Sequence, residues 1–381
     1  MNLQAHQVKT FAKWLGLSLI VLTVILYILA PFIIKHYLNY RVLNDMGAYS
    51  GHVDDVDLGL IDGEYLLKDL IIKRDHPHNP VDFFTVKTFA IALSWEGLRN
   101  GEILTRVKLT KPELTFLDAK QEEDKQTGEG TNWLSVFEEI LPVTLHKLVI
   151  HDGIIRFQNL DTTPTVNIAV EDIDAELTNL TNVKDASGRR VASATLTGQL
   201  FGDSPLSAKA DFDPFDFNDF QFAADAKNVR INRLNDFSRA YANIDFKSGH
   251  GQIFFELSAH NRELDGYLKP LFEDVNIASW SQDVEQQGDN PLQLLWEAGW
   301  GLLSAIFTNL ESNKLGTQID ISGSLEDTDI SSWQAVVGVV HNAFIDALHS
   351  RYENITPLTS EPETDTQKTE EQNESPGDKL K

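Results

Sequence analysis

Hydrophobic and polar residues alternate along most of the chain after Val53. Residues 89–95 show the pattern clearly, because alanine or serine separates Phe89, Ile91, Leu93 and Trp95. Apolar residues at every second position are typical of β-strands that bury one face. The same alternation predicts strands near 107–109, 114–116, 148–150, 154–157, 166–170, 173–177, 192–200, 206–212, 220–226, 253–259, 264–268 and 315–325.

Short turn motifs separate these predicted strands. Asp-Gly, Asn-Gly or Gly-Asp pairs occur at 62–63, 100–101, 152–153, 202–203 and 265–266. Such pairs favour tight turns, and strands joined by tight turns are antiparallel neighbours. The pattern therefore predicts an antiparallel meander. The alternation slips near Glu171 and Asp172, which predicts a β-bulge at that point.

The predicted strands carry apolar residues on one face and Ser, Thr, Asp, Asn or Lys on the other. A sheet of this kind must cover its apolar face. A second sheet, closure into a barrel, or curvature into a trough that holds an apolar molecule would each cover it. The alternation alone does not choose among these three arrangements.

A few segments have helical rather than extended spacing. Residues 132–141 and 233–241 predict short helices between strands, and residues 332–350 predict a C-terminal amphipathic helix. Residues 291–310 are apolar on almost every side, which fits a buried lid on the sheet, a helix in contact with a membrane, or a second span. Residues 353–381 are polar and acidic, and we expect a disordered tail there.

An uncharged stretch, residues 14–34, precedes the predicted strands. A helix that rises about 1.5 Å per residue needs about 20 apolar residues to cross a hydrocarbon core of about 30 Å. The stretch is longer than the apolar core of a cleaved signal peptide and lacks a small-residue cleavage site, so we predict an uncleaved signal anchor. Lys9 and Lys13 precede it without any acid, which predicts a cytoplasmic tail at 1–13 and a C-terminal domain on the other side.

Composition narrows the classes of function. The chain has 381 residues and a formal net charge of −25, which argues against nucleic acid as a partner. It contains no cysteine, which excludes thiol catalysis, disulfides and thiolate metal sites. This composition is compatible with an oxidising compartment such as a bacterial periplasm.

The sequence contains no familiar catalytic motif. It lacks a nucleophile elbow, a phosphate-binding Gly-Lys-Ser/Thr loop, a dinucleotide fingerprint and a His-Glu-x-x-His pair. His76 and His78 lie in a proline-containing segment that we interpret as an exposed loop. Asp54, Asp55 and Asp57 could approach a cation, but alternation sends Asp55 to the opposite face from its neighbours. We therefore predict no catalytic residue, no cofactor and no metal, and a protein that is not an enzyme.

The order of these features resembles the AsmA-like family of Gram-negative envelope proteins, which is related in architecture to TamB and other bridge-like lipid-transfer proteins. The resemblance is carried by the anchor and by the segments 53–60, 70–72, 107–116, 148–157 and 319–326. The segment 148–157 resembles a recurrent strand, Asp-Gly turn and strand of that family. The similarity extends over roughly residues 53–348, and the family has no catalytic residues to transfer to this chain.

The resemblance implies an inner-membrane anchor and a periplasmic domain over residues 35–352, built as a long, curled antiparallel sheet with an open apolar groove. It implies a protein that handles phospholipid acyl chains in support of outer-membrane biogenesis and envelope integrity. The partners that it implies are the membrane, phospholipid, and an envelope protein or a second copy of the chain. The candidate groove residues are Phe89, Ile91, Leu93, Trp95, Phe116, Ile150, Phe222, Phe255 and Leu257. The alternative is a periplasmic scaffold or adaptor for outer-membrane protein assembly that transfers no lipid.

Overall fold

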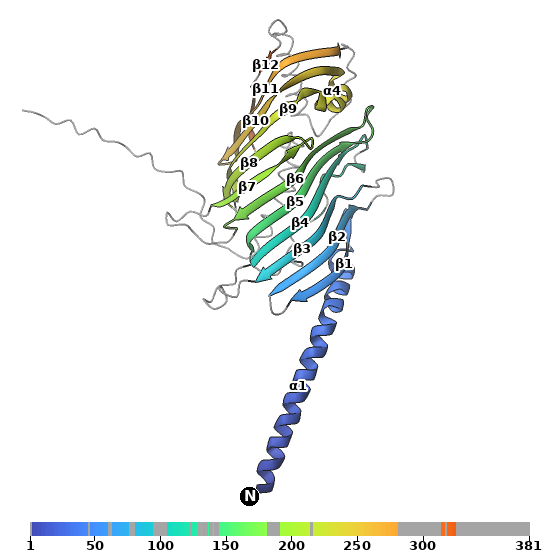
Figure 1. The fold of residues 1–381 in the computed structure, drawn as a ribbon, viewed down its shortest axis with the longest axis vertical. Coiled ribbons are helices and arrows are strands. Elements are labelled where there is room, and N and C mark those ends of the chain that lie inside the picture. The colour runs from blue at the N-terminus through green and yellow to red at the C-terminus, as the bar shows by residue number, and fades with distance from the viewer. Residues whose placement is uncertain are drawn as a thin grey trace, which may run out of the picture.

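The computed structural model describes residues 2–44, 46–59, 63–75, 81–93, 105–121, 124–128, 131, 136, 140, 145–180, 191–213, 216–280, 314–316 and 318–324. Within these ranges one long helix is followed by one sheet (Figure 1). The helical elements are α1 (Asn2–Tyr37), the π-helical turn η1 (Leu38–Val42), the 3-10 turn η3 (Ile231–Leu234) and α4 (Asn235–Ala242). The strands are β1 (Tyr49–Gly59), β2 (Glu64–Arg74), β3 (Phe84–Leu93), β4 (Thr105–Asp118), β5 (Leu145–Asn159), β6 (Val166–Thr178), β7 (Ala192–Leu200), β8 (Ser204–Asp213), β9 (Asp216–Arg230), β10 (Ile244–His260), β11 (Glu263–Trp280), β12 (Lys314–Gly316) and β13 (Ile319–Ser324).

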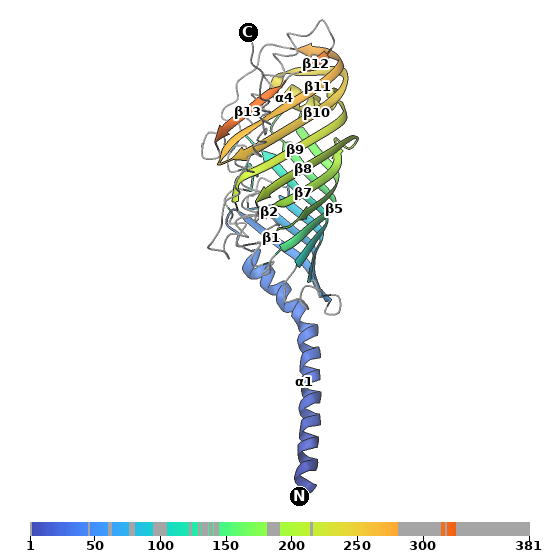
Figure 2. The same ribbon diagram turned by 90° about the vertical axis from the view of Figure 1, so that its left-hand side faces the viewer.

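The strands pair in chain order from β1 to β12, and β13 pairs with β11. Figures 1 and 2 show them stacked along the long axis, from β1 beside α1 to β12 at the far end. Among the residues that the structure describes, no pairing joins β1 to the last strands, so the sheet is open. This confirms the predicted fold class: mainly β, with an N-terminal helix and an open sheet.

The predicted antiparallel arrangement is wrong at one place. β4 and β5 are parallel, whereas the other neighbouring strands are antiparallel. A parallel pair requires a connection of about a dozen residues or more, because the chain must return to the edge where the first strand began. Residues 119–144 separate the two strands and provide that length. The sheet is therefore mixed rather than antiparallel throughout.

Several predicted elements have the expected limits. β7 covers 192–200 as predicted, and the chain turns at Gly202-Asp203 before β8. The predicted helix at 233–241 corresponds to η3 and α4. Predicted helices at 291–310 and 332–350 and the predicted tail at 353–381 lie outside the described residues. Of the predicted helix at 132–141, the structure describes only Val136 and Ile140, and both are helical.

Two Asp-Gly pairs, at which the sequence predicted turns, lie inside strands. β5 continues through Asp152-Gly153, and β11 begins before Asp265-Gly266. The chain instead reverses between β10 and β11 at Asn261 and Arg262, whose φ angles are 50° and 69°. Gly266 lies opposite Leu257, where the two backbones approach so closely that a Cβ atom at residue 266 would be 2.3 Å from the Glu256 carbonyl oxygen. Close strand approach, rather than a turn, therefore requires glycine there.

A row of irregular backbone positions crosses β2 to β6. Asp69, Lys111, Asp152 and Asp172 have φ angles of 50° to 54°, and their strands bring them into line. Side chains pair along the row: Lys87 contacts Asp69 at 2.9 Å, and Lys111 contacts Asp152 at 3.2 Å. The strand register shifts between Glu171 and Asp174, so the predicted bulge is confirmed. We call Asp69, Lys87, Lys111, Asp152 and Asp172 the bulge row.

The bulge row preserves a single apolar face. Buried residues are spaced by two along each half of a strand but by three across the row, as between Leu67 and Leu70 and between Val86 and Phe89. An extra residue at this level reverses the alternation, so both halves of the strand direct their apolar side chains to the same side. Register shifts are present at this level in β5 and β6, and bulges of this kind increase strand twist and bend. The row therefore contributes to the curvature of the sheet.

The end of the helical segment, at η1 and Leu43, covers the free edge of β1. Asn39 accepts a hydrogen bond from the Val53 amide at 2.8 Å and donates one to the Val53 carbonyl at 2.9 Å. The Leu43 carbonyl accepts from the Gly51 amide at 2.5 Å. An uncovered edge strand would present unpaired backbone groups to water or to another strand. The helix therefore joins the sheet along a hydrogen-bonded edge rather than through a loose linker.

Candidate functional site: the apolar face of the sheet

The strand register places apolar side chains in two continuous rows across the sheet. The first apolar row consists of Val56, Leu67, Phe89, Leu109, Ile150, Ala175, Leu196, Ala208, Ala224, Phe255 and Leu268, each paired with the next across neighbouring strands. The second apolar row consists of Leu58, Tyr65, Ile91, Val107, Leu148, Leu177, Ala194, Ala210, Phe222, Leu257, Gly266 and Ile321. At a strand spacing of about 4.8 Å, each row extends for about 50 Å.

The rows contain six of the nine candidate groove residues. Phe89, Ile150 and Phe255 belong to the first row, and Ile91, Phe222 and Leu257 belong to the second. Of the other three, Leu93 pairs with Thr105 next to the second row, and Phe116 pairs with Phe157 beyond the bulge row. Trp95 lies outside the described residues.

Three of these candidates are packed rather than accessible. Phe89, Ile91 and Leu257 are only 4%, 6% and 3% exposed. Phe89 and Ile91 belong to the large core cluster near the anchor, which also contains residues of η1. Leu257 belongs to a small cluster at the ends of β9 to β11. A ligand would contact these side chains only if their neighbours moved.

The middle of the rows is more open in part, since Ala175 and Ala208 of the first row are buried there. Ala194, Leu196, Ala210 and Ala224 are half-buried, and none of them belongs to the three core clusters. We call these four residues the alanine segment. Three of the four side chains are alanine, so they extend less far from the sheet than the Phe and Leu residues on both sides. Sequence reasoning missed the segment because it selected large residues, although the alternation of Ala192, Ala194 and Leu196 marked the same face.

The opposite face of the sheet is polar. Lys209, Asp211 and Glu256 line an open depression of about 350 Å³ there, beside Ala223 and Tyr267. A hydrogen bond with Glu256 raises the pKa of Tyr267 above its usual value, and desolvation adds to the effect. Charged groups of both signs in an open depression do not suit an acyl chain. The charged side chains and the two apolar rows therefore lie on opposite faces of the sheet.

Lys68 occupies the space near the aspartates of β1. Its Nζ atom contacts Asp57 and lies 3.3 Å from Asp55, and hydrogen bonds to Asp57 and then Asp55 raise the pKa of Lys68. We predicted that Asp55 faces away from both Asp54 and Asp57. The prediction is wrong for Asp57, because residues two apart in a strand lie on the same face. In the part of the chain that the structure describes, no group of three or more His, Asp or Glu residues could hold a metal ion. His76 and His78 lie outside that part.

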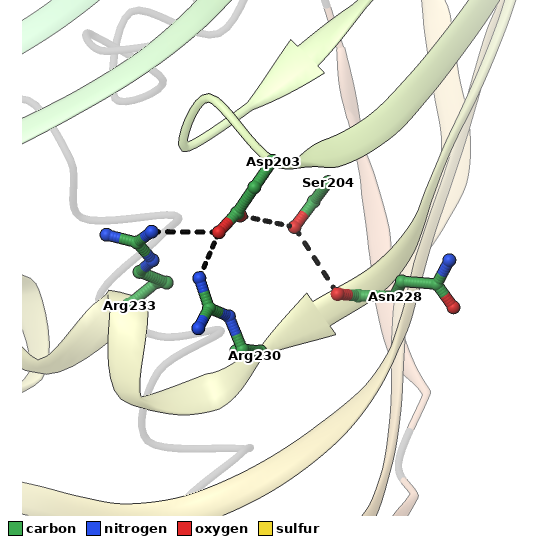
Figure 3. A network of polar contacts seen from close by, with 5 residues as sticks. All are labelled: Asp203, Ser204, Asn228, Arg230 and Arg233. Atoms are coloured by element: carbon green, nitrogen blue, oxygen red, sulfur yellow. Dashed lines mark hydrogen bonds and ion pairs between the residues drawn. The ribbon is translucent and has the colours of Figure 1, made fainter.

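A polar network fastens the β7–β8 turn to the end of β9 (Figure 3). Asp203 pairs with Arg230 and, at 2.8 Å, with Arg233 of η3. Ser204 donates to Asp203 at 3.3 Å or to the Asn228 carbonyl at 3.4 Å. Hydrogen bonds from Arg233 and Arg230 hold the pKa of Asp203 below its ordinary value of 3.8. The network fixes η3 and α4 above one end of the apolar face, next to a core cluster that includes Ile231.

Asp203→Asn is expected to lower the urea midpoint of unfolding at pH 7. A carboxyl group whose pKa is lower in the folded state stabilises that state above its unfolded pKa, and loses this effect as the pH falls through the folded pKa. The difference from the parent protein should therefore shrink as the pH decreases below about 3.8. Asp211→Asn, in the next strand, is the control. A difference that persists unchanged at pH 2.5 would contradict the charge-based explanation.

No family model matches the chain, and no curated protein matches it either. The resemblance to the AsmA-like family therefore rests on the sequence features quoted above and stays a prediction. The argument for function depends on the geometry of the apolar face and of α1.

Proposed function

We propose that this chain is a membrane-anchored, non-enzymatic protein that holds phospholipid acyl chains against the apolar face of its open sheet. In this proposal α1 crosses a bacterial inner membrane, and the sheet lies in the periplasm. Handling of lipid there would support outer-membrane biogenesis and envelope integrity, as the family resemblance implies. The observation that carries the proposal is the continuity of the two apolar rows, which no polar side chain other than the Tyr65 hydroxyl interrupts.

The energetic argument follows from the half-buried part of the rows, which lies beyond the core near the anchor. An acyl chain leaves a bilayer only where other apolar surface replaces its surroundings, since each exposed CH₂ group costs about 0.8 kcal/mol. The rows extend for about 50 Å, but most of their members from β1 to β4 are packed in the core near the anchor. The alanine segment provides half-buried surface beyond that core. A surface without a charged binding site lets a chain slide along it.

The composition and exposure of α1 support the anchor. The segment Lys13–Val42 is long and apolar enough to cross a membrane, and an 18-residue window within it has a mean hydropathy of 2.8. Its apolar side chains are exposed, including Trp14, Leu19 and Phe32. Exposed apolar surface on this scale is typical of contact with lipid or another protein. Lys9 and Lys13 favour an orientation with the N-terminus in the cytoplasm.

Photo-crosslinking tests the proposal without interference from lipid around the anchor. A photoreactive amino acid at position 196, on the first apolar row, should crosslink to phospholipid in intact membranes. The same group at position 195, which is on the opposite face, should not. Crosslinking at 196 that matches the background at 195 would contradict lipid binding and favour the scaffold alternative.

Ala224→Trp is expected to reduce the crosslinking at position 196 at least threefold. The first row pairs Leu196 with Ala208 and Ala208 with Ala224, so an indole at 224 would fill volume two strands away. Ala223→Trp is the matched control, because residue 223 is exposed on the polar face. Phospholipid crosslinks are measured by mass spectrometry. Equal reductions in both variants would show that the effect is not specific to the apolar face.

A further inference from the structure

The free edge of β1 is hydrogen-bonded to α1 well below the end of the helix. The Tyr27 hydroxyl donates to the Leu58 carbonyl at 2.9 Å, and the Lys35 ammonium donates to the Asp54 carbonyl. Eight residues of helix cover about 12 Å, and four residues of strand cover about 13 Å. The two contacts are therefore consistent with β1 running antiparallel beside the helix, and Figure 1 shows the end of β1 beside the upper part of α1.

The length of the helix sets the depth of this contact in a membrane. From Lys13 to Tyr27 the helix rises about 21 Å, which is less than the hydrocarbon thickness of about 30 Å. From Lys13 to Lys35 it rises about 33 Å, so the two lysines match the two boundaries of the hydrocarbon. If α1 spans the membrane, Tyr27 and the Leu58 carbonyl then lie inside the hydrocarbon, about 12 Å below the level of Lys35.

We propose that the end of the β1–β2 hairpin, marked by Leu58 and Leu66, is inserted into the outer leaflet of the membrane that α1 crosses. This inference rests on the proposed span. The proposed interaction surface is the hairpin end. Its partner is the acyl region of the outer leaflet, which is the leaflet on the same side of the membrane as the sheet.

Part of the local chemistry suits this environment, whereas Glu64, which pairs with Gly59 closer to the hairpin end than Leu66, places an exposed carboxyl group there at a cost. Backbone polar groups within a bilayer need partners in the protein, and the Tyr27 hydroxyl provides one for a carbonyl on the free edge of the sheet. Leu66 is an apolar residue on the face of β2 opposite the apolar rows, and it pairs with Asp57 of β1. Asp57 is paired with Lys68, which lowers the cost of charge near hydrocarbon.

Insertion would connect the bilayer directly to the apolar face. The second apolar row begins within the hairpin end, at Leu58 and Tyr65, which pair with each other. At the proposed depth these two side chains lie level with acyl chains of the outer leaflet. A lipid tail then meets Leu58 and Tyr65 from hydrocarbon, without first crossing water, and moves further along the row only when the packed side chains from Ile91 to Leu148 shift. The proposal thus assigns the hairpin as the entry point for the lipid that the sheet is proposed to hold.

Single cysteines can test the depth of the hairpin because the chain contains none of its own. Spin labels are attached to Leu66→Cys, Ile71→Cys and Leu29→Cys in full-length protein, reconstituted in vesicles of phosphatidylethanolamine and phosphatidylglycerol. Residues 66 and 71 lie on the same strand, and Ile71 is about 16 Å further along it. Accessibility to oxygen, which partitions into hydrocarbon, is compared with accessibility to a water-soluble nickel chelate.

The labels at 66 and 29 should both favour oxygen, whereas the label at 71 should favour the nickel chelate. A label at 66 that behaves like 71, while 29 remains in hydrocarbon, would overturn the insertion but leave the anchor intact. Nickel accessibility at both 29 and 66 would remove the anchor and, with it, the proposed function.

Tyr27→Phe provides a second measurement that does not disturb the core. It removes the donor to the Leu58 carbonyl, which would leave that group unpaired in hydrocarbon. The label at 66 should then shift towards nickel accessibility by at least twofold, with the label at 29 unchanged. Tyr40→Phe, at an exposed tyrosine above Lys35, is the control. An unchanged label at 66 in Tyr27→Phe would contradict the role assigned to the hydroxyl.

Discussion

Leu67→Ala is expected to lower the free energy of unfolding of the sheet by about 2–5 kcal/mol. The Leu67 side chain is 0% exposed and lies in the first apolar row between Val56 and Phe89. Removal of its branched end would leave a cavity beneath neighbours that belong to rigid paired strands. The cost combines the lost transfer free energy with the cavity itself. The shift is measured as the change in urea midpoint, multiplied by the slope of the transition.

Leu66→Ala is the matched control for this experiment. Leu66 precedes Leu67 on β2 but faces the other side of the sheet and is half-buried. The same change of side chain there should cost less than about 1 kcal/mol in detergent micelles, because no closed cavity forms. Equal losses in the two variants would contradict the assignment of Leu67 to a packed interior.

Gly251→Ala is expected to cost about 3 kcal/mol or more, and to separate part of β10 from β11. A Cβ atom at residue 251 would lie 2.0 Å from the carbonyl oxygen of Leu271 and 2.7 Å from the Cα atom of Phe272. Both neighbours are backbone atoms of the paired strand, so no side-chain rotation relieves the clash. The variant should be cleaved within β10 or β11 by limited proteolysis under conditions in which the parent protein is expected to stay intact there.

Gly316→Ala tests whether this effect depends on backbone contact. The nearest atom to a Cβ at residue 316 is the Cδ2 atom of Leu271, at 3.3 Å, and this flexible side-chain end can move. We expect a loss below about 1 kcal/mol and no new proteolytic site. A similar loss in both variants would show that the close approach of β10 and β11 does not limit the size of residue 251.

Local sequence signals predicted those parts of the fold that depend on local structure. The strand at 192–200 and the turn at 202–203 needed only alternation and a glycine with a φ of 73°. The slip at 171–172 predicted a bulge because the apolar spacing changed there. The same change of spacing, between Leu67 and Leu70 or Val86 and Phe89, marks the rest of the bulge row and was readable in the sequence.

Other features depended on contacts between distant segments. Asp152-Gly153 has the composition of a turn, yet the strands on both sides of β5 hold it extended with a bulge at Asp152. The parallel pairing of β4 and β5 depends on the path of residues 119–144, and the helical spacing at 132–141 did not specify that path. Among the candidate groove residues, the sequence did not separate the packed Phe89 from the half-buried Phe222, because both are aromatic residues on an apolar face.

The sequence by itself determined that an uncharged helix precedes a sheet with one apolar face, because hydrophobic spacing reports local geometry directly. Only the tertiary structure aligned residues from Val56 to Leu268 into a continuous row, since register depends on pairing between strands far apart in the chain. The contact between Tyr27 and Leu58 is likewise tertiary, because it depends on how the helix docks along the sheet edge. Alternation in the sequence thus indicates which apolar side chains share one face of the sheet. Packing in the folded protein decides which of these side chains remain accessible to a ligand.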